Sequence, residues 1–173
     1  MRFVPTALPG VTVVEPEPVA DARGHFARLY CPDEFARAGI AFVPTQTSVS
    51  FNRVRHTLRG MHYCVEAENK LVHCTRGRMF DVALDLRRDS PAFRRWFAVE
   101  LDPVRANALY IPSGVAHGFL SLEPDTDVLY QIDRRYRPGF DAGVRWNDPQ
   151  FAIDWPAVPA VIDPRDRDYP DFA

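Results

Sequence analysis

The sequence is poor in lysine, in long apolar runs and in cysteine. Among its 21 basic residues Lys70 is the only lysine, because arginine fills every other basic position. A lysine that persists where arginine is the default indicates a position that needs a compact ammonium and not a planar guanidinium. No apolar stretch approaches the roughly 20 residues of a spanning helix, and the first residues lack the layout of a signal peptide. These absences predict a cytoplasmic protein with no membrane partner.

The scarce cysteines exclude two further kinds of architecture. Cys31, Cys64 and Cys74 are odd in number and unrelated in spacing, so they fit neither a disulfide framework nor a CxxC zinc site. A net charge of −2, a pI near 6.2 and the lack of basic runs give no reason to expect nucleic acid as a partner. The 16 prolines gather over residues 5–18 and 149–170, which predicts extended or looping ends.

Short runs rich in β-branched and aromatic residues recur at intervals of about 8–12 residues, which is typical of an all-β sandwich or barrel. The predicted strands span residues 11–14, 26–30, 45–51, 57–63, 70–75, 79–86, 96–101, 108–111, 118–122 and 128–132. One helix is predicted over residues 33–38, with Asp33 as its N-cap and Gly39 at its end, and a second short helix near residues 149–152. No repeat or linker divides the chain, so we expect one domain over residues 1–173. Closure into a jelly-roll barrel would protect the edge strands.

Several titratable residues carry no functional prediction. Alternation over residues 79–86 places Asp81 and Asp85 opposite Val82 and Leu84, so we expect the two aspartates on a solvated strand face. The histidines expected to be structural or surface residues are His25, His56 and His73.

Residues 111–119, Ile-Pro-Ser-Gly-Val-Ala-His-Gly-Phe, resemble the second half of the cupin signature, Pro-x-Gly-x-x-His. In metal-binding cupins that histidine, here His117, is a ligand, and the other ligands come from an earlier His-x-His followed by a glutamate. The corresponding place reads His62-Tyr63-Cys64, so one of the two histidines is missing. We therefore expect no metal. The alternative is a metal-dependent cupin oxygenase or isomerase that uses His62, Cys64, Glu68 and His117.

Nearly the whole chain resembles the dTDP-4-dehydrorhamnose 3,5-epimerases. The motifs that carry the resemblance are Asp21-x-Arg23-Gly24-x-Phe26, residues 58–63 (Leu-Arg-Gly-Met-His-Tyr), 70–72 (Lys-Leu-Val), 81–87 (Asp-Val-Ala-Leu-Asp-Leu-Arg), 110–119, Leu129-Tyr130, 146–149 (Trp-Asn-Asp-Pro) and Asp166. The resemblance implies a jelly-roll enzyme, without metal or cofactor, that acts on a nucleotide-linked 4-keto-6-deoxy sugar. It also implies a homodimer in which the N-terminal strands of each subunit cross to the partner and complete its site.

Epimerisation beside a ketone requires a base on one face of the sugar, an acid on the other and a donor for the enolate oxygen. The resemblance assigns the base to His62, the carboxylate that holds it to Asp166 and the acid to Tyr130. It assigns the positive charge on the enolate oxygen to Lys70, and the diphosphate to Arg59 and Arg23. The substrate-binding residues that it implies are Arg23, Phe26, Arg28, Gln46, Arg59, His117 and Tyr136.

The nucleotide is the part of the substrate that the sequence leaves open. At the position of Arg28 the family usually carries a glutamate that helps to bind thymine, and an arginine cannot accept a hydrogen bond from the thymine ring N–H. We therefore expect dTDP to bind less well than some other nucleoside diphosphate, with GDP as the first candidate. A GDP- or CDP-linked 4-keto sugar is the alternative substrate. Inversion at C3, at C5 or at both stays open, as does the role of Cys64, which stands where the family usually has glutamine. The alternative outside enzymes is a non-catalytic cupin that binds sugar nucleotides.

Overall fold

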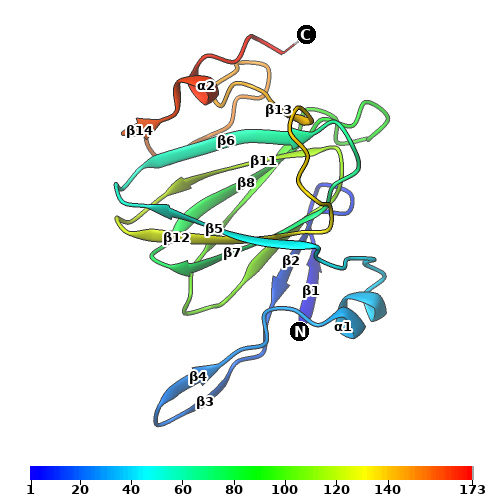
Figure 1. The fold of residues 1–173 in the computed structure, drawn as a ribbon, viewed down its shortest axis with the longest axis vertical. Coiled ribbons are helices and arrows are strands. Elements are labelled where there is room, and N and C mark those ends of the chain that lie inside the picture. The colour runs from blue at the N-terminus through cyan, green and yellow to red at the C-terminus, as the bar shows by residue number, and fades with distance from the viewer. Residues whose placement is uncertain (173) are drawn as a thin grey trace.

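The computed structural model describes residues 1–172, and most of its strands lie in two facing β-sheets (Figure 1). The first sheet has the order β1-β2-β10-β7-β12-β5. Its strands are β1 (Arg2–Pro5), β2 (Thr12–Glu15), β10 (Ala108–Ile111), β7 (Lys70–Arg76), β12 (Thr126–Ile132) and β5 (Gln46–Asn52). The second sheet has the order β13-β6-β11-β8-β9, and β14 pairs in parallel with the first residues of β6. Its strands are β13 (Asp141–Gly143), β6 (Thr57–Cys64), β11 (Val115–Ser121), β8 (Met79–Asp85), β9 (Trp96–Leu101) and β14 (Val161–Ile162).

The apolar core lies between the sheets, where Val72 and Val128 of the first sheet pack with Phe119 of the second. All neighbouring strands except the β6–β14 pair run antiparallel, and alternate residues along each strand point into this core. Two facing antiparallel sheets of this kind form a jelly-roll barrel. The all-β jelly-roll class predicted from the sequence is confirmed.

The outer faces of both sheets are covered as well. Helix α1 (Pro32–Arg37) packs its buried Phe35 on the first sheet. On the second sheet, Phe151 and Trp155 from the C-terminal part of the chain cover Val82 and Leu84 of β8. The inner face of β8 carries Asp81 and Asp85.

Both aspartates are fully buried, so the prediction that they face solvent was wrong. Asp85 forms a bidentate ion pair with Arg87 and accepts a hydrogen bond from Ser90. Asp81 faces the barrel interior and contacts His117. Strand alternation identifies one apolar face, and we assigned the other face to solvent. Here a distant segment covers the apolar face, and the polar face lines the barrel.

A short hairpin projects from the barrel near the N-terminus (Figure 1), formed by β3 (Val19–Asp21) and β4 (Gly24–Phe26). The strand predicted over residues 26–30 is therefore wrong beyond Phe26. After Phe26 the chain no longer continues as a strand. Tyr30 packs instead against Phe35 and Phe42, and its hydroxyl donates to the carbonyl of Phe42 at 2.6 Å.

The two helices also depart from the prediction. Cys31 and not Asp33 is the N-cap of α1, whereas Gly39 follows the helix end with a φ of 77°, as expected for a terminating glycine. Residues 149–152 form a turn on Asp148 instead of a helix. The second helix is α2 (Pro164–Arg167), in the proline-rich region that was predicted to loop. Neither helix in residues 1–172 is long and apolar enough to cross a membrane.

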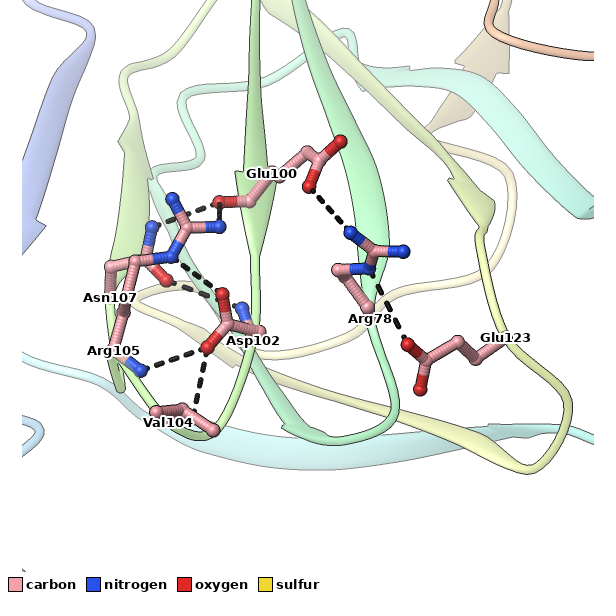
Figure 2. Close-up of polar contacts among 7 residues, drawn as sticks. All are labelled: Arg78, Glu100, Asp102, Val104, Arg105, Asn107 and Glu123. Atoms are coloured by element: carbon pink, nitrogen blue, oxygen red, sulfur yellow. Dashed lines mark hydrogen bonds and ion pairs between the residues drawn. The ribbon is translucent and has the colours of Figure 1, made fainter.

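One end of the barrel is closed by turns whose polar groups bind each other (Figure 2). In the β7–β8 turn, Arg78 lies 3.3 Å from Glu100 and 3.5 Å from Glu123. Asp102 accepts two backbone N–H bonds from the β9–β10 turn, at 2.8 and 2.9 Å, and an ion pair from Arg105. We call this set of turns the closed end.

Candidate active site

A bulge in β6 brings Arg59 and His62 to the same side of the sheet. Residues three positions apart on a regular strand point to opposite faces. Only two steps along β11 span the three steps from Arg59 to His62, so β6 carries one extra residue here. Gly60 lies in the bulge with a φ of 133°, and a Cβ there would lie 2.4 Å from the Cα of Gly118. The close approach of the two strands therefore requires glycine.

Both side chains line a cavity of about 220 Å³ inside the barrel. Its wall is completed by Lys70, His117, Phe119, Tyr130 and Ile132. These residues come from β7 and β12 of the first sheet and β11 of the second, so both sheets contribute. The structure thus brings five of the predicted site residues to one place, namely Arg59, His62, Lys70, His117 and Tyr130.

Asp166 lies directly behind His62. Its Oδ1 is 2.6 Å from Nε2 of His62, and its Oδ2 accepts the backbone N–H of Gly60 at 3.0 Å. Burial alone would raise the pKa of Asp166, but the hydrogen bonds from His62 and Gly60 outweigh burial and hold this pKa below its ordinary value. The carboxylate therefore stays ionised near neutral pH and can stabilise a positive charge on the His62 ring.

Helix α2 delivers Asp166 to the site. Asp163 caps this helix by accepting the N–H of Arg165 at 2.9 Å. The ring of Tyr169, just after α2, lies against Gly143, where a Cβ would be 2.4 Å from the ring. Because Gly143 pairs with His62 across β13 and β6, the same packing ties α2 to the strand that carries the histidine.

Lys70 and Tyr130 face the cavity from neighbouring strands of the first sheet. Lys70 pairs with Ile132, two residues beyond Tyr130, so all three side chains share one face. The ammonium of Lys70 lies 3.3 Å from Oε1 of Glu68. A cation and a phenol therefore line the same wall of the cavity.

Two side chains that the sequence did not identify orient residues of the cavity. Asn52 accepts from Nε of Arg59 at 2.9 Å, and its amide nitrogen donates to two backbone carbonyls, which fixes the direction of the amide. Asp81 lies 2.6 Å from Nε2 of His117. No motif marks Asn52, whereas Asp81 belongs to a motif of the resemblance and only its burial was missed.

The projecting hairpin holds predicted binding residues away from the cavity of its own chain. The side chain of Arg23 is 90% exposed and Phe26 is 71% exposed. Arg28 follows the hairpin, and its guanidinium lies 3.2 Å from Glu34 of α1. Within one chain, none of these three residues lines the cavity.

The other two predicted binding residues differ in position. Gln46, at the start of β5, pairs with Ile132 of the cavity wall. Tyr136 follows β12 and is exposed. Gln46 therefore adjoins the cavity, whereas Tyr136 does not line it.

The donors of the alternative metal site do not converge. His62 and His117 line the cavity, but Cys64 and Glu68 contact Arg134, at 3.0 and 3.9 Å. Across residues 1–172 no group of three or more His, Cys, Asp or Glu side chains is arranged to hold a metal ion.

A second hollow, of about 520 Å³, lies between β6, β14 and α2. Arg59, His62 and Asp166 line it, and Arg165 of α2 adds a second guanidinium. Because Arg59 and His62 also line the first cavity, the two spaces adjoin at these side chains. Two guanidinium groups suit an anionic part of a ligand.

Comparison with known proteins places the chain among sugar-nucleotide epimerases. The family model described as dTDP-4-dehydrorhamnose 3,5-epimerase matches residues 5–173. The chain is 38% identical to the dTDP-4-dehydrorhamnose 3,5-epimerase of Methanothermobacter thermautotrophicus, over 97% of this chain and 92% of the relative. It is 37% identical to the dTDP-4-dehydrorhamnose 3-epimerase of Streptomyces niveus, over 97% of this chain and 82% of the relative.

Solved structures agree. The Bacillus anthracis dTDP-4-dehydrorhamnose 3,5-epimerase, with TDP and PPi bound, superposes with a TM-score of 0.95 at 34% identity, over 99% of both chains. ChmJ, a 3'-monoepimerase from Streptomyces bikiniensis in complex with dTDP-quinovose, superposes with a TM-score of 0.91 at 32% identity, over 97% of this chain and 86% of that one.

Proposed function

This chain belongs to the dTDP-4-dehydrorhamnose 3,5-epimerase family, and from that premise we propose that it inverts C3, C5 or both carbons of a dTDP-linked 4-keto-6-deoxy sugar. Its family relatives are epimerases, so the chain is an enzyme of the isomerase class. The observation that carries the proposal is the cavity on which His62, Lys70 and Tyr130 converge, with Asp166 behind His62.

In this proposal His62 removes the proton from the carbon beside the ketone. Nε2 of His62 is bound to Asp166, which leaves Nδ1 as the nitrogen that accepts the proton. The imidazolium formed in this step lies against an ionised carboxylate, as in hydrolytic triads. Asp166 therefore stabilises the protonated ring until His62 releases this proton.

Lys70 and Tyr130 complete the reaction. The electron pair of the broken C–H bond moves to the ketone oxygen, where the ammonium of Lys70 stabilises the enolate. Tyr130 then donates its proton to the same carbon from the face opposite His62, which inverts the centre. His62 loses its proton to solvent and Tyr130 regains one, so the enzyme is restored without a metal or a cofactor.

The anionic part of the substrate would lie beside Arg59 and Arg165 in the second hollow. The relatives' names include dTDP, so dTDP is the nucleotide of this proposal. Arg28 contacts Glu34 within this chain, so the proposal assigns Arg28 no contact to the nucleobase. The sequence-based expectation that GDP binds better than dTDP stays a prediction.

The projecting hairpin supports a homodimer in which one subunit completes the cavity of the other. Exposed Arg23 and Phe26 on the hairpin would supply the diphosphate and base contacts that one chain lacks. Arg23→Ala and His62→Asn, each of low activity alone, should then regain activity when they are unfolded and refolded together. One site of each mixed dimer would carry both wild-type residues. Failure to regain activity in a verified mixed dimer would contradict a shared site.

The proposed reaction is tested by incubation in D2O with dTDP-, GDP- and CDP-linked 4-keto-6-deoxy sugars. NMR should show deuterium at C3, C5 or both and an inverted product for the dTDP sugar. Tyr130→Phe should still exchange the hydrogen through His62 but yield little inverted product. A better GDP substrate would confirm the expectation from Arg28 and change only the nucleotide. Binding without exchange for every sugar would leave the non-catalytic alternative.

A further inference from the structure

Glu68 lies just outside the cavity and contacts its only lysine. Oε1 of Glu68 is 3.3 Å from the ammonium of Lys70, and the two side chains are only 10% and 15% exposed. Lys70 lines the cavity and Glu68 does not, so the carboxylate holds the ammonium from behind. Partly buried pairs are screened by salt far less than surface pairs. The contact can therefore keep its geometry in solution.

The carboxylate of Glu68 is held from its other side by Arg134. Oε2 of Glu68 lies 3.9 Å from Nη1 of Arg134. Arg134 is itself fixed by Glu66 at 2.6 Å, by Sγ of Cys64 at 3.0 Å and by the ring of Phe140, whose centre is 4.9 Å away. Glu68 thus lies between a fixed guanidinium and the ammonium at the cavity.

The backbone between Glu68 and Lys70 is also fixed. The N–H and the side-chain amide of Asn69 donate to Asp133, at 2.9 and 2.6 Å. The amide oxygen of Asn69 accepts the N–H of Ser113 at 2.9 Å. Asn69 is therefore bound to the residue that follows β12 and to the turn before β11. These bonds fix the backbone on which the side chains of Glu68 and Lys70 are carried.

We propose that Glu68 is a positioning residue that sets the place of the Lys70 ammonium on the cavity wall. The inference rests on the proposed function, in which this ammonium stabilises the enolate. Electrostatic stabilisation is largest when the charge is in place before the reaction begins. A long, flexible lysine needs an external partner for this, and the shared carboxylate of Glu68 supplies one.

The test compares Glu68→Gln with the control Glu66→Gln, which changes a neighbouring glutamate that contacts Arg134 and not Lys70. Because Lys70 is the only lysine, lysine labelled with 13C at Cε gives one signal, whose relaxation reports the motion of this side chain. Glu68→Gln should make the Cε group mobile and lower kcat by about 10–100-fold, with KM nearly unchanged. Glu66→Gln should leave both the signal and kcat near wild type, because Arg134 keeps its other contacts.

The outcomes separate the inference from the proposed function. An unchanged Lys70 signal in Glu68→Gln, or equal mobility in Glu66→Gln, overturns the positioning role. A mobile Lys70 with unchanged turnover upholds the positioning role and overturns the catalytic role of Lys70. If Glu68→Gln does not fold, Glu68→Asp replaces it. This variant keeps the negative charge but moves the carboxylate away from Lys70 by one methylene, and the Lys70 signal and kcat are measured in the same way.

Discussion

The closed end of the barrel and its cavity use the same kinds of side chain in opposite ways. At the closed end, Arg78 is shared by two glutamates and Asp102 accepts hydrogen bonds from the turn that it begins (Figure 2). In the cavity, Arg59 and His62 are each oriented by one side-chain contact, to Asn52 and Asp166. Their remaining side-chain nitrogens make no hydrogen bond to another described residue.

The difference shows how a binding site can be recognised in a protein whose binding and structural regions use the same types of polar side chain. Polar groups that satisfy one another hold turns and have nothing left to offer a ligand. Polar groups held by one partner are fixed in direction yet keep free donors or acceptors, which is the preorganisation that catalysis requires. Changes in the cavity should therefore affect turnover, and changes at the closed end should affect stability.

The largest expected effect is that of His62→Asn. Loss of the base should lower kcat by about 10²–10⁴-fold, with the unfolding temperature nearly unchanged. The matched control is His56→Asn in the β5–β6 turn, where a φ of 61° is one that asparagine tolerates. Steady-state kinetics checks both variants. Turnover of His62→Asn close to wild type would remove His62 as the base.

Lys70→Arg should lower turnover nearly as much although it keeps the charge. A planar guanidinium cannot place a point charge in the space of an ammonium, and losing one oxyanion donor typically costs about 2.7–4 kcal/mol of barrier. Arg76→Lys, the reverse exchange at the far end of the same strand, is the control and should be neutral. Full activity of Lys70→Arg would show that the single lysine is incidental.

Unlike His62, the buried His73 has no carboxylate partner among the described residues, and its protonation should affect stability and not turnover. Burial lowers the pKa of His73 to about 4, and neither ring nitrogen has a hydrogen-bond partner within residues 1–172. The unfolded chain takes up this proton near pH 6.5, so stability should fall as pH decreases from about 6.5 to 4, by at most about 3 kcal/mol. Urea unfolding at pH 5 and 7 should show a smaller loss on acidification in His73→Leu than in wild type. Equal losses would mean that His73 does not titrate in this window.

The smallest effect is expected at the closed end. Asp102→Ala leaves the β9–β10 turn without its cap and should lower the free energy of unfolding by about 1–2 kcal/mol. Glu123→Gln removes only an exposed partner of Arg78 and should cost less than about 1 kcal/mol. Both should retain wild-type turnover. A loss of turnover in Asp102→Ala without unfolding would break the contrast between the two ends.

The strands were predictable where short runs rich in apolar and aromatic residues lie between turns. The predicted spans 96–101 and 108–111 coincide with β9 and β10, which are nearly continuous apolar runs with a turn on either side. The site residues on strands and Asp166 came from the resemblance. Their convergence on one cavity could not be predicted from spacing, since the bulge at Gly60 changes which side chains share a face.

What could not be predicted depends on contacts between distant segments. Asp81 is buried because its face of β8 lines the barrel interior, while the C-terminal part of the chain covers the opposite face, and no local pattern indicates either arrangement. Asn52, the last residue of β5 in the first sheet, orients Arg59 of β6 in the second sheet, and this contact between the two sheets forms only in the folded barrel. Helix α2 lies in a proline-rich stretch, where the general rule against helices fails because Pro164 occupies the first helical position.

The bulge in β6 has a consequence for how such an enzyme can change over evolution. Residues Thr57 and Leu58, before the bulge, pair with β14, whereas residues His62 to Cys64, after it, pair with β13. One strand thus carries two stretches that share β11 on one side but have different neighbours on the other side and a different side-chain phase. Arg59 and His62 lie three residues apart, on either side of the bulge. The arginine proposed to bind the anion and the proposed base are therefore held by different local pairings and can diverge separately.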